Sequence, residues 1–195
     1  MIPKAYNHQS EMTDFIRRTL KCFVTSDPGT GKTRAVLDAI ITLGGATLVL
    51  APLSILQPAW GNDTEQFTPD QTYSCSYARK RAETFALPVD ITITNHDAVK
   101  WVAKQLKEDP HFLDRFDTLI IDECTAFKNR TTQRSTALRE ISNHFERIVE
   151  LTGTLNSNGV LDTWHPTFIL DDGHRLGKNF FQFRSSMCSP VQVGP

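Results

Sequence analysis

A glycine-rich turn, SDPGTGKT, occupies residues 26–33 and ends in a lysine and a threonine. The apolar stretch CFVT comes directly before it, and RAVLDAIITL, which has helical spacing, follows it. Between a strand and a helix, the backbone N–H groups of such a turn can surround phosphates at the helix N-terminus. Lys32 would reach the β and γ phosphates, and the Thr33 hydroxyl would hold Mg²⁺. The turn therefore predicts a site for ATP and Mg²⁺.

Eight consecutive residues are expected to contact the nucleotide: Asp27, Pro28, Gly29, Thr30, Gly31, Lys32, Thr33 and Arg34. Ser26 stands where the strict pattern has glycine, at a position that mainly needs a small residue. The alternative is a glycine turn that only caps a helix.

An acidic pair, Asp122 and Glu123, follows the apolar run LII in the stretch DTLIIDECTAFKN. At the end of a buried strand, Asp122 would coordinate Mg²⁺ through water and Glu123 would polarise the attacking water. With Lys32, these two are the candidate catalytic residues. The alternative for Asp122 alone is a helix N-cap.

Short apolar runs rich in β-branched residues alternate with segments of helical spacing, and the runs are typical of strands buried on both faces of a parallel sheet. We expect strands at 22–25, 46–51, 89–94, 117–122 and 147–152, and helices at 12–20, 35–43, 98–106 and 138–145. This alternation predicts a doubly wound α/β layer sandwich with a parallel sheet.

The composition sets further bounds. A chain of 195 residues can fill one core. Its 21 basic and 22 acidic residues leave a net charge of −1, so any nucleic-acid binding must use a local patch.

The four cysteines show no C-x-x-C pair, which argues against a zinc site or disulfide framework. Without a signal-peptide pattern or a membrane-spanning run, we expect a soluble intracellular protein with no membrane partner.

The order of the motifs resembles the first RecA-like lobe of superfamily-two helicases and translocases, most closely the Swi/Snf-type DNA-dependent ATPases of bacteria and phages. The resemblance covers residues 6–184. It implies a three-layer RecA-like P-loop NTPase domain with a mostly parallel central sheet, in the cytoplasm of a bacterium or a phage-infected host cell. YNHQ resembles the Q motif, in which Gln9 would read the adenine edge, while SDPGTGKT and DECTAFKN resemble motifs I and II. LVLAPLSILQPAW resembles motif Ia, and LTGTLNSNGVLDTW, with Asn156, Asn158 and Trp164, resembles motif III and its downstream helix.

The resemblance implies two further groups of residues. Thr152, Gly153 and Thr154 would couple the motif II carboxylates to nucleic-acid-facing loops. Contacts to the nucleic-acid backbone, most simply double-stranded DNA, would come from Pro52, Ser54, Asn95, Lys128 and Asn129. The basic run at 79–81 is interpreted as a solvated helix face. Cys124, Thr125 and Leu155 depart from the usual motifs, and we expect them to tune coupling without abolishing ATP binding.

In this family ATP lies between two RecA-like lobes, and the second lobe supplies arginines worth roughly 10³ to 10⁵ in rate at related sites. We expect residues 1–184 to form the ATP-binding lobe, 185–195 to form a linker or loose tail, and the second lobe to be absent. Such a chain would bind ATP–Mg²⁺ and hydrolyse it poorly unless a partner chain completes the cleft. Two alternatives are a non-enzymatic nucleotide- or DNA-binding module from a truncated phage product, and a P-loop kinase, against which LTGTLNSN argues.

Overall fold

A computed structural model describes residues 2–154 and 159–189 of the chain. Its core is a six-stranded sheet in the order β1-β6-β5-β2-β4-β3, in which every neighbouring pair is parallel. The strands are β1 (Lys21–Thr25), β2 (Ala46–Ala51), β3 (Tyr73–Ser76), β4 (Ile91–Asn95), β5 (Phe116–Asp122) and β6 (Arg147–Thr152). The α/β fold is confirmed, and the sheet is wholly parallel where a mostly parallel one was predicted.

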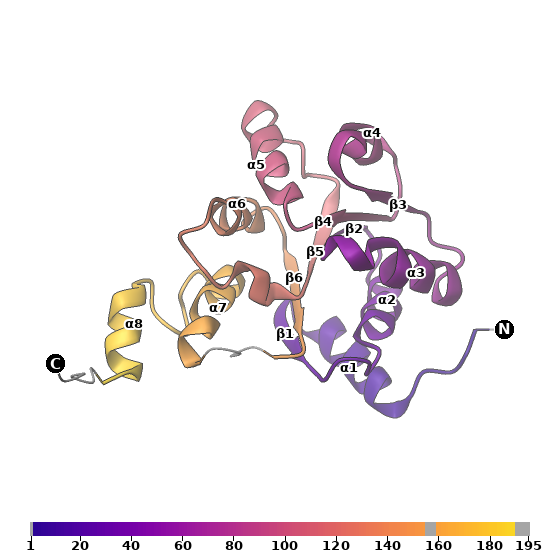
Figure 1. The fold of residues 1–195 in the computed structure, drawn as a ribbon. Coiled ribbons are helices and arrows are strands. Elements are labelled where there is room, and N and C mark those ends of the chain that lie inside the picture. The colour runs from indigo at the N-terminus through magenta and orange to yellow at the C-terminus, as the bar shows by residue number, and fades with distance from the viewer. Residues whose placement is uncertain (1, 155–158, 190–195) are drawn as a thin grey trace.

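Helices cover both faces of the sheet (Figure 1). The α-helices are α1 (Asn7–Arg18), α2 (Lys32–Leu43), α3 (Asn62–Phe67), α4 (Arg81–Ala86), α5 (Ala98–Glu108), α6 (Gln133–Ser142), α7 (Trp164–Asp171) and α8 (Phe180–Met187). Short helical turns are η1 (Leu53–Ile55), η2 (Leu56–Gly61), η3 (Ala78–Lys80), η4 (Cys124–Phe127) and η5 (Val160–Thr163).

Alternate residues of each central strand enter two separate cores. Val49, Ile120 and Leu151 pack against α1, α2 and Trp60, whereas Leu48 and Ile121 pack against α5, α6 and α7. Because side chains of a strand alternate between its faces, strands buried on both sides need apolar residues at nearly every position. The apolar runs in the sequence therefore mark the strands well.

The structure departs from the sequence predictions at polar or short elements. The strand β3, with the sequence YSCS, was missed because it is a short edge strand without an apolar run. The first helix ends at Arg18 and not at Leu20, and α6 ends at Ser142 before the predicted Phe145. The predicted tail begins at Ser185, whereas helix α8 continues to Met187. Residues 190–195 of that tail lie outside the described part of the chain. No helix among the described residues is long and apolar enough to cross a membrane.

Candidate nucleotide site

The loop between β1 and α2 leaves the first turn of α2 available to an anion. Gly29 and Gly31 both have φ of +79°, a conformation that side chains with a Cβ rarely adopt. The helix begins at Lys32 with no side-chain cap and no acidic residue in its first turn. By contrast, Thr132 and Asn179 cap α6 and α8 with their side chains. Uncapped N–H groups and the positive end of the helix dipole together suit a phosphate group.

The Lys32 ammonium lies against this loop. Its Nζ donates hydrogen bonds to the carbonyl oxygens of Ser26 and Asp27, at 2.8 Å and 3.1 Å. The Thr30 hydroxyl donates to the Asp27 carbonyl at 2.8 Å, which closes the turn. Burial raises the pKa of Asp122, and the Lys32 charge opposes that rise. The loop and the acidic strand end therefore interact electrostatically.

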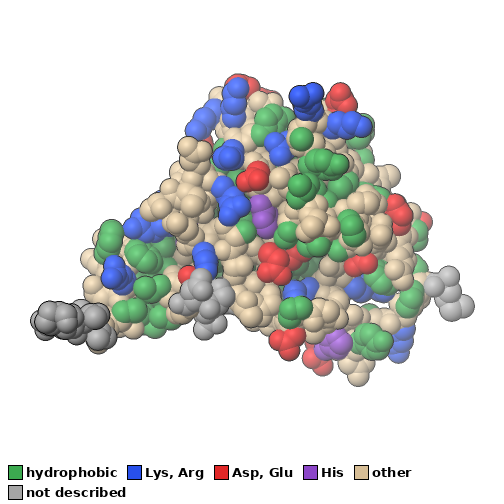
Figure 2. Space-filling view, viewed as in Figure 1, with side chains coloured by type: hydrophobic (Ala, Val, Ile, Leu, Met, Phe, Trp, Pro, Cys, Tyr) green, Lys and Arg blue, Asp and Glu red, His purple; other side chains and the backbone are tan. Residues whose placement is uncertain are grey.

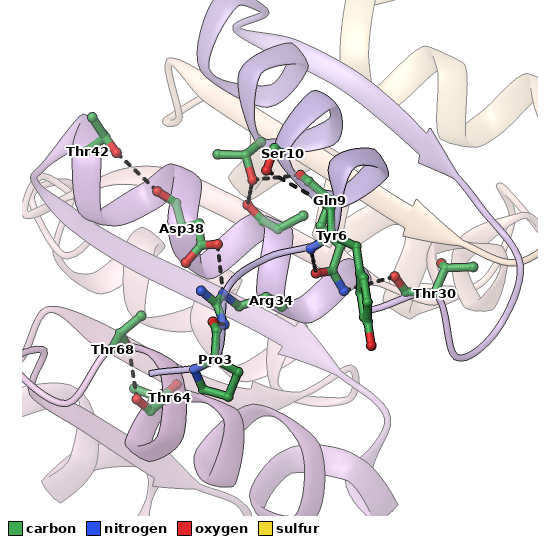
Figure 3. Close-up of polar contacts among 12 residues, drawn as sticks. Pro3, Tyr6, Gln9, Ser10, Thr30, Arg34, Asp38, Thr42, Thr64 and Thr68 are labelled. Carbon is green, nitrogen blue, oxygen red and sulfur yellow. Dashed lines mark hydrogen bonds and ion pairs between the residues drawn. The ribbon is translucent and has the colours of Figure 1, made fainter. Parts of the chain in front are cut away.

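Gln9 packs directly on the loop (Figure 3). Its Oε1 accepts a hydrogen bond from the Tyr6 N–H at 3.0 Å, and its Nε2 donates to the Thr30 carbonyl at 3.3 Å. A Cβ placed on Gly31 would lie 2.1 Å from this Nε2, so the close approach of Gln9 requires glycine there. Tyr6 and His8 stack beside it with ring centroids 5.8 Å apart. The predicted adenine-reading residue thus lies beside the predicted phosphate loop.

Arg34 is bound to protein groups in this structure. Its Nε donates to the Asp38 carboxylate at 2.7 Å, and its Nη1 donates to the Pro3 carbonyl at 3.2 Å (Figure 3). Its guanidinium also lies 4.3 Å from the centre of the Phe67 ring. These contacts join the N-terminal segment, α2 and α3. The predicted nucleotide contact of Arg34 remains a prediction, because its side chain already has these partners.

Asp122, at the end of β5, has hydrogen-bond partners that the sequence did not predict. The buried Trp60 donates from Nε1 to Asp122 Oδ2 at 2.9 Å, and the Glu123 backbone N–H donates to Oδ1 at 3.0 Å. His96 Nε2 bonds the Asp122 carbonyl at 2.7 Å. Burial raises the pKa of Asp122, and the Glu123 charge adds to this, while the Trp60 bond and Lys32 oppose it. The carboxylate is thus fixed in direction but costly to ionise without a cation.

Glu123 adopts a left-handed conformation with φ of +51°, which is unusual for a residue other than glycine. Its Oε2 lies 3.4 Å from the Thr152 hydroxyl at the end of the adjacent strand β6. The Thr152 Oγ1 also accepts a hydrogen bond from the Thr154 N–H at 3.2 Å. A Cβ on Gly153 would lie 3.1 Å from the Pro28 ring, so the predicted coupling segment contacts both the acidic pair and the loop.

A second buried carboxyl lies behind the acidic pair and was missed in the sequence. Glu150 on β6 is 1 % exposed, and its carboxyl accepts a hydrogen bond from the Cys124 thiol. Burial raises the pKa of Glu150 well above its ordinary value, and it also raises the pKa of Cys124. The run RIVELT does not by itself indicate that its glutamate is buried, because a glutamate in a strand can also face solvent.

The predicted nucleic-acid residues lie near the same edge of the sheet but do not form one cluster. Ala51, just before Pro52, pairs in register with Asn95, whose amide oxygen accepts a bond from the Arg81 Nη2 at 2.8 Å. Ser54 is exposed on η1. Lys128 makes an ion pair with Asp162 at 2.9 Å, and Asn129 accepts bonds from Thr131 within its own turn.

The interpretation of the basic run at 79–81 as a solvated face is wrong for Arg81, which is partly buried against Asn95. The sequence alone does not distinguish Arg81, whose partner lies on another element, from its exposed neighbours Arg79 and Lys80. The motif III positions Leu155, Asn156 and Asn158 lie outside the described residues.

Comparison with known proteins bears directly on these motifs. The sequence profile of the DEAD/DEAH box helicase family matches residues 6–163. The chain belongs to this family. Protein p41 of Acyrthosiphon pisum secondary endosymbiont phage 1 is 30 % identical, over 98 % of this chain and 44 % of its own length. An uncharacterized ATP-dependent helicase of Mycoplasma genitalium, MG018, is 24 % identical over 72 % of this chain and 14 % of its own length.

Among solved structures, the SWI2/SNF2 ATPase core of Sulfolobus solfataricus in complex with dsDNA superimposes with a TM-score of 0.78. It is 22 % identical and is matched over 94 % of this helicase-family chain and 38 % of the archaeal chain. The fold is therefore that of a first RecA-like lobe, as the order of motifs predicts. The chain spans less than half of the length of both p41 and the archaeal core.

Proposed function

We propose that this chain is the ATP-binding lobe of a nucleic-acid-dependent ATPase of the helicase-like translocase type. The observation that carries the proposal is the fixed Asp122 carboxylate beside the Lys32 loop, held by Trp60 and the Glu123 backbone. Family membership gives this arrangement its ATP-dependent context.

The residues present fit ATP and Mg²⁺. Uncapped N–H groups of the first turn of α2 and the Lys32 ammonium would bind the phosphates. The Thr33 hydroxyl and Asp122 supply the oxygen ligands that Mg²⁺ prefers, and each carboxylate oxygen of Asp122 keeps a lone pair for a metal-bound water. A bound cation would offset the raised pKa of Asp122 and keep it ionised.

Glu123 is the residue that would orient the attacking water. Its carboxylate is exposed enough to take part in proton transfer, and the Thr152 hydroxyl at 3.4 Å limits its rotation. A shift of the Thr152–Thr154 segment would move Glu123, which gives the coupling residues a direct physical route to the reaction. Bound Mg²⁺ would neutralise charge on the phosphates.

The nucleic-acid partner is proposed to be double-stranded DNA, contacted through its backbone by Pro52, Ser54, Asn95, Lys128 and Asn129. The SWI2/SNF2 core that shares the fold was solved with dsDNA. With a net charge of −1 the lobe would bind DNA weakly, with an affinity that falls steeply with salt. A second RecA-like lobe, from another segment or chain, would complete the ATP cleft and supply arginine to the transferring phosphoryl group.

The test is ATP–Mg²⁺ binding by calorimetry for the unaltered chain, Lys32→Ala and Glu123→Gln. Lys32→Ala should lose detectable binding, and Glu123→Gln should keep it because Glu123 acts on water. Lys4→Ala, which removes an exposed lysine, is the matched control. Undiminished ATP affinity in Lys32→Ala would refute the site. Adding the second-lobe protein and duplex DNA should stimulate hydrolysis, and binding without any stimulation would favour a non-enzymatic module.

A further inference from the structure

A cavity of about 360 Å³ lies between α6, α7 and the start of α8. None of the residues proposed to bind ATP lines it. The cavity lies at the end of the molecule formed by α7 and α8, on the side opposite α1 and α2 (Figure 1). Lys and Arg side chains lie among hydrophobic ones on this part of the surface (Figure 2). The cavity thus combines cations and rings at a site that the ATPase chemistry does not use.

Two arginines on the cavity wall lie over aromatic rings. The Arg130 guanidinium lies 4.8 Å from the ring centre of Phe180 and 5.1 Å from that of Phe181. Arg139 lies 4.5 Å from the ring centre of Phe168. Neither arginine has a carboxylate partner within the described part of the chain. A stacked guanidinium keeps its edge N–H groups for an anion, and it matches phosphate oxygens in pairs.

Two buried polar atoms on residues that line the cavity have no hydrogen-bond partner among the described residues. They are the indole Nε1 of Trp164, which is 6 % exposed, and Nδ1 of His165, which is 3 % exposed. The other ring nitrogen of His165 bonds the Phe127 backbone, and burial lowers the pKa of His165 to about 4, so Nδ1 is an acceptor at neutral pH. Residues that line the cavity thus carry one unused donor and one unused acceptor.

An exposed ring completes the cavity. Phe181 is 62 % exposed, whereas the neighbouring cluster of Trp164, Phe168 and Phe183 is buried. The cluster explains those three rings as core packing, whereas Phe181 lies outside it and contacts the Phe180 ring and Arg130. An exposed ring beside phosphate-binding groups can stack a base of any sequence.

We propose that this cavity is a second nucleotide site, which takes one phosphorylated nucleoside. Arg130, Arg139 and Lys178 would bind its phosphate, and Phe181 would stack its base. The ligand is either a mononucleotide from solution or one unpaired nucleotide of a nucleic-acid strand. Arg130 directly follows Lys128 and Asn129, so a strand on those proposed contacts would lead toward the cavity. The site itself requires neither the ATP site nor a second lobe.

The test measures anisotropy of a labelled oligothymidylate of about 12 nucleotides, a usual length for a single-strand site, at low salt. Unlabelled thymidine monophosphate and inorganic phosphate serve as competitors. Arg130→Gln and Phe181→Ala are compared with Arg18→Gln and Phe15→Ala, which remove an exposed arginine and an exposed phenylalanine from α1. Phe181→Trp keeps a stacking ring and should retain affinity. Thermal unfolding of each variant checks that the fold is kept.

We expect Arg130→Gln and Phe181→Ala to weaken binding at least about fivefold, with the α1 variants unchanged. Loss of both oligonucleotide and monophosphate binding would identify a site open to mononucleotides, and loss of the oligonucleotide alone would identify a nucleotide within a strand. Equal affinities in cavity and α1 variants would overturn the proposal. Competition by inorganic phosphate as strong as that by the monophosphate would overturn base recognition. ATP binding that depends on Lys32 would survive either failure.

Discussion

At the end of β5, Asp122 accepts hydrogen bonds from Trp60 and the Glu123 backbone, and these bonds aim a carboxylate at the Lys32 loop. Two strands away in the sheet, at the end of β4, the amide oxygen of Asn95 accepts a hydrogen bond from Arg81. Both side chains are buried strand-end groups with partners. The bonds to Asp122 orient an anion that still needs a cation, whereas the bond to the Asn95 oxygen orients a neutral amide whose Nδ2 is the donor for a phosphate.

The two ends of the sheet edge therefore differ in charge and in number of groups. A cation at Asp122 adds to the existing bonds, since carboxylate oxygens have lone pairs to spare, and the Lys32 loop supplies further contacts to the nucleotide. A phosphate at Asn95 would accept a hydrogen bond from one neutral amide, which gains less than a contact between opposite charges. This difference predicts tighter binding of ATP than of nucleic acid by the lobe, and the following variants test it.

Trp60→Phe should have the largest effect. It removes a buried donor to a carboxylate, which costs about 1–3 kcal/mol, and it lets Asp122 rotate away from the metal position. Both the free energy of unfolding and the affinity for ATP–Mg²⁺ should fall. Trp101→Phe is the matched control, because Trp101 packs against Phe85 and Phe112 away from the acidic pair. Equal behaviour of the two variants would show that the Trp60 bond does not organise the site.

Glu150→Gln tests the buried carboxyl behind Asp122. Because the pKa of Glu150 is raised in the folded protein, stability should be greatest below the unfolded pKa and decline as pH rises toward the folded pKa. The slope is at most about 1.4 kcal/mol per pH unit. The glutamine variant should lose that decline between acidic and neutral pH in chemical unfolding, whereas Glu146→Gln, at an exposed site, should keep it. An unchanged slope in Glu150→Gln would show that Glu150 is ionised when folded.

Gly31→Ala and Gly29→Ala separate backbone strain from the contact with Gln9. Both positions have φ of +79°, so each alanine costs about 1–2 kcal/mol in stability. A Cβ at Gly29 meets nothing within 4 Å, whereas one at Gly31 displaces the Gln9 amide. Gly31→Ala should therefore also reduce the preference for ATP over GTP, measured by competition binding. A preference equal in the two variants would contradict the role of Gln9 in reading the base.

The smallest effects are expected on the nucleic-acid side, where Ser54→Ala and Asn95→Ala form a pair. Each should weaken duplex binding at low salt by about 1 kcal/mol or less. Asn95→Ala should also lower stability because it leaves the partly buried Arg81 without its acceptor, while Ser54→Ala at an exposed position should not. Duplex affinity that matches the unaltered chain in both variants would place the nucleic-acid track elsewhere.

The sequence by itself determined the strands β1, β2, β4, β5 and β6, and it predicted the residues of the nucleotide site. Strands buried on both faces need runs such as ATLVLA and DTLIID, and phosphate binding needs glycines and a lysine at fixed spacing, so local order carries this information. Asp122 and Lys32 could be assigned because each lies beside its own strand. The edge strand β3 escaped notice because its two buried residues, Ser74 and Ser76, are polar, so the strand has no apolar run.

Tertiary structure alone decided the partners of these residues. Trp60 lies 62 positions before Asp122, and Arg81 lies 14 before Asn95, and nothing in the intervening sequence specifies either contact. Glu150 became a buried carboxyl only because β6 lies between β1 and β5 with helices on both faces. Such pairings depend on how the sheet orders its strands, which is a property of packing the whole chain and not of any motif within it.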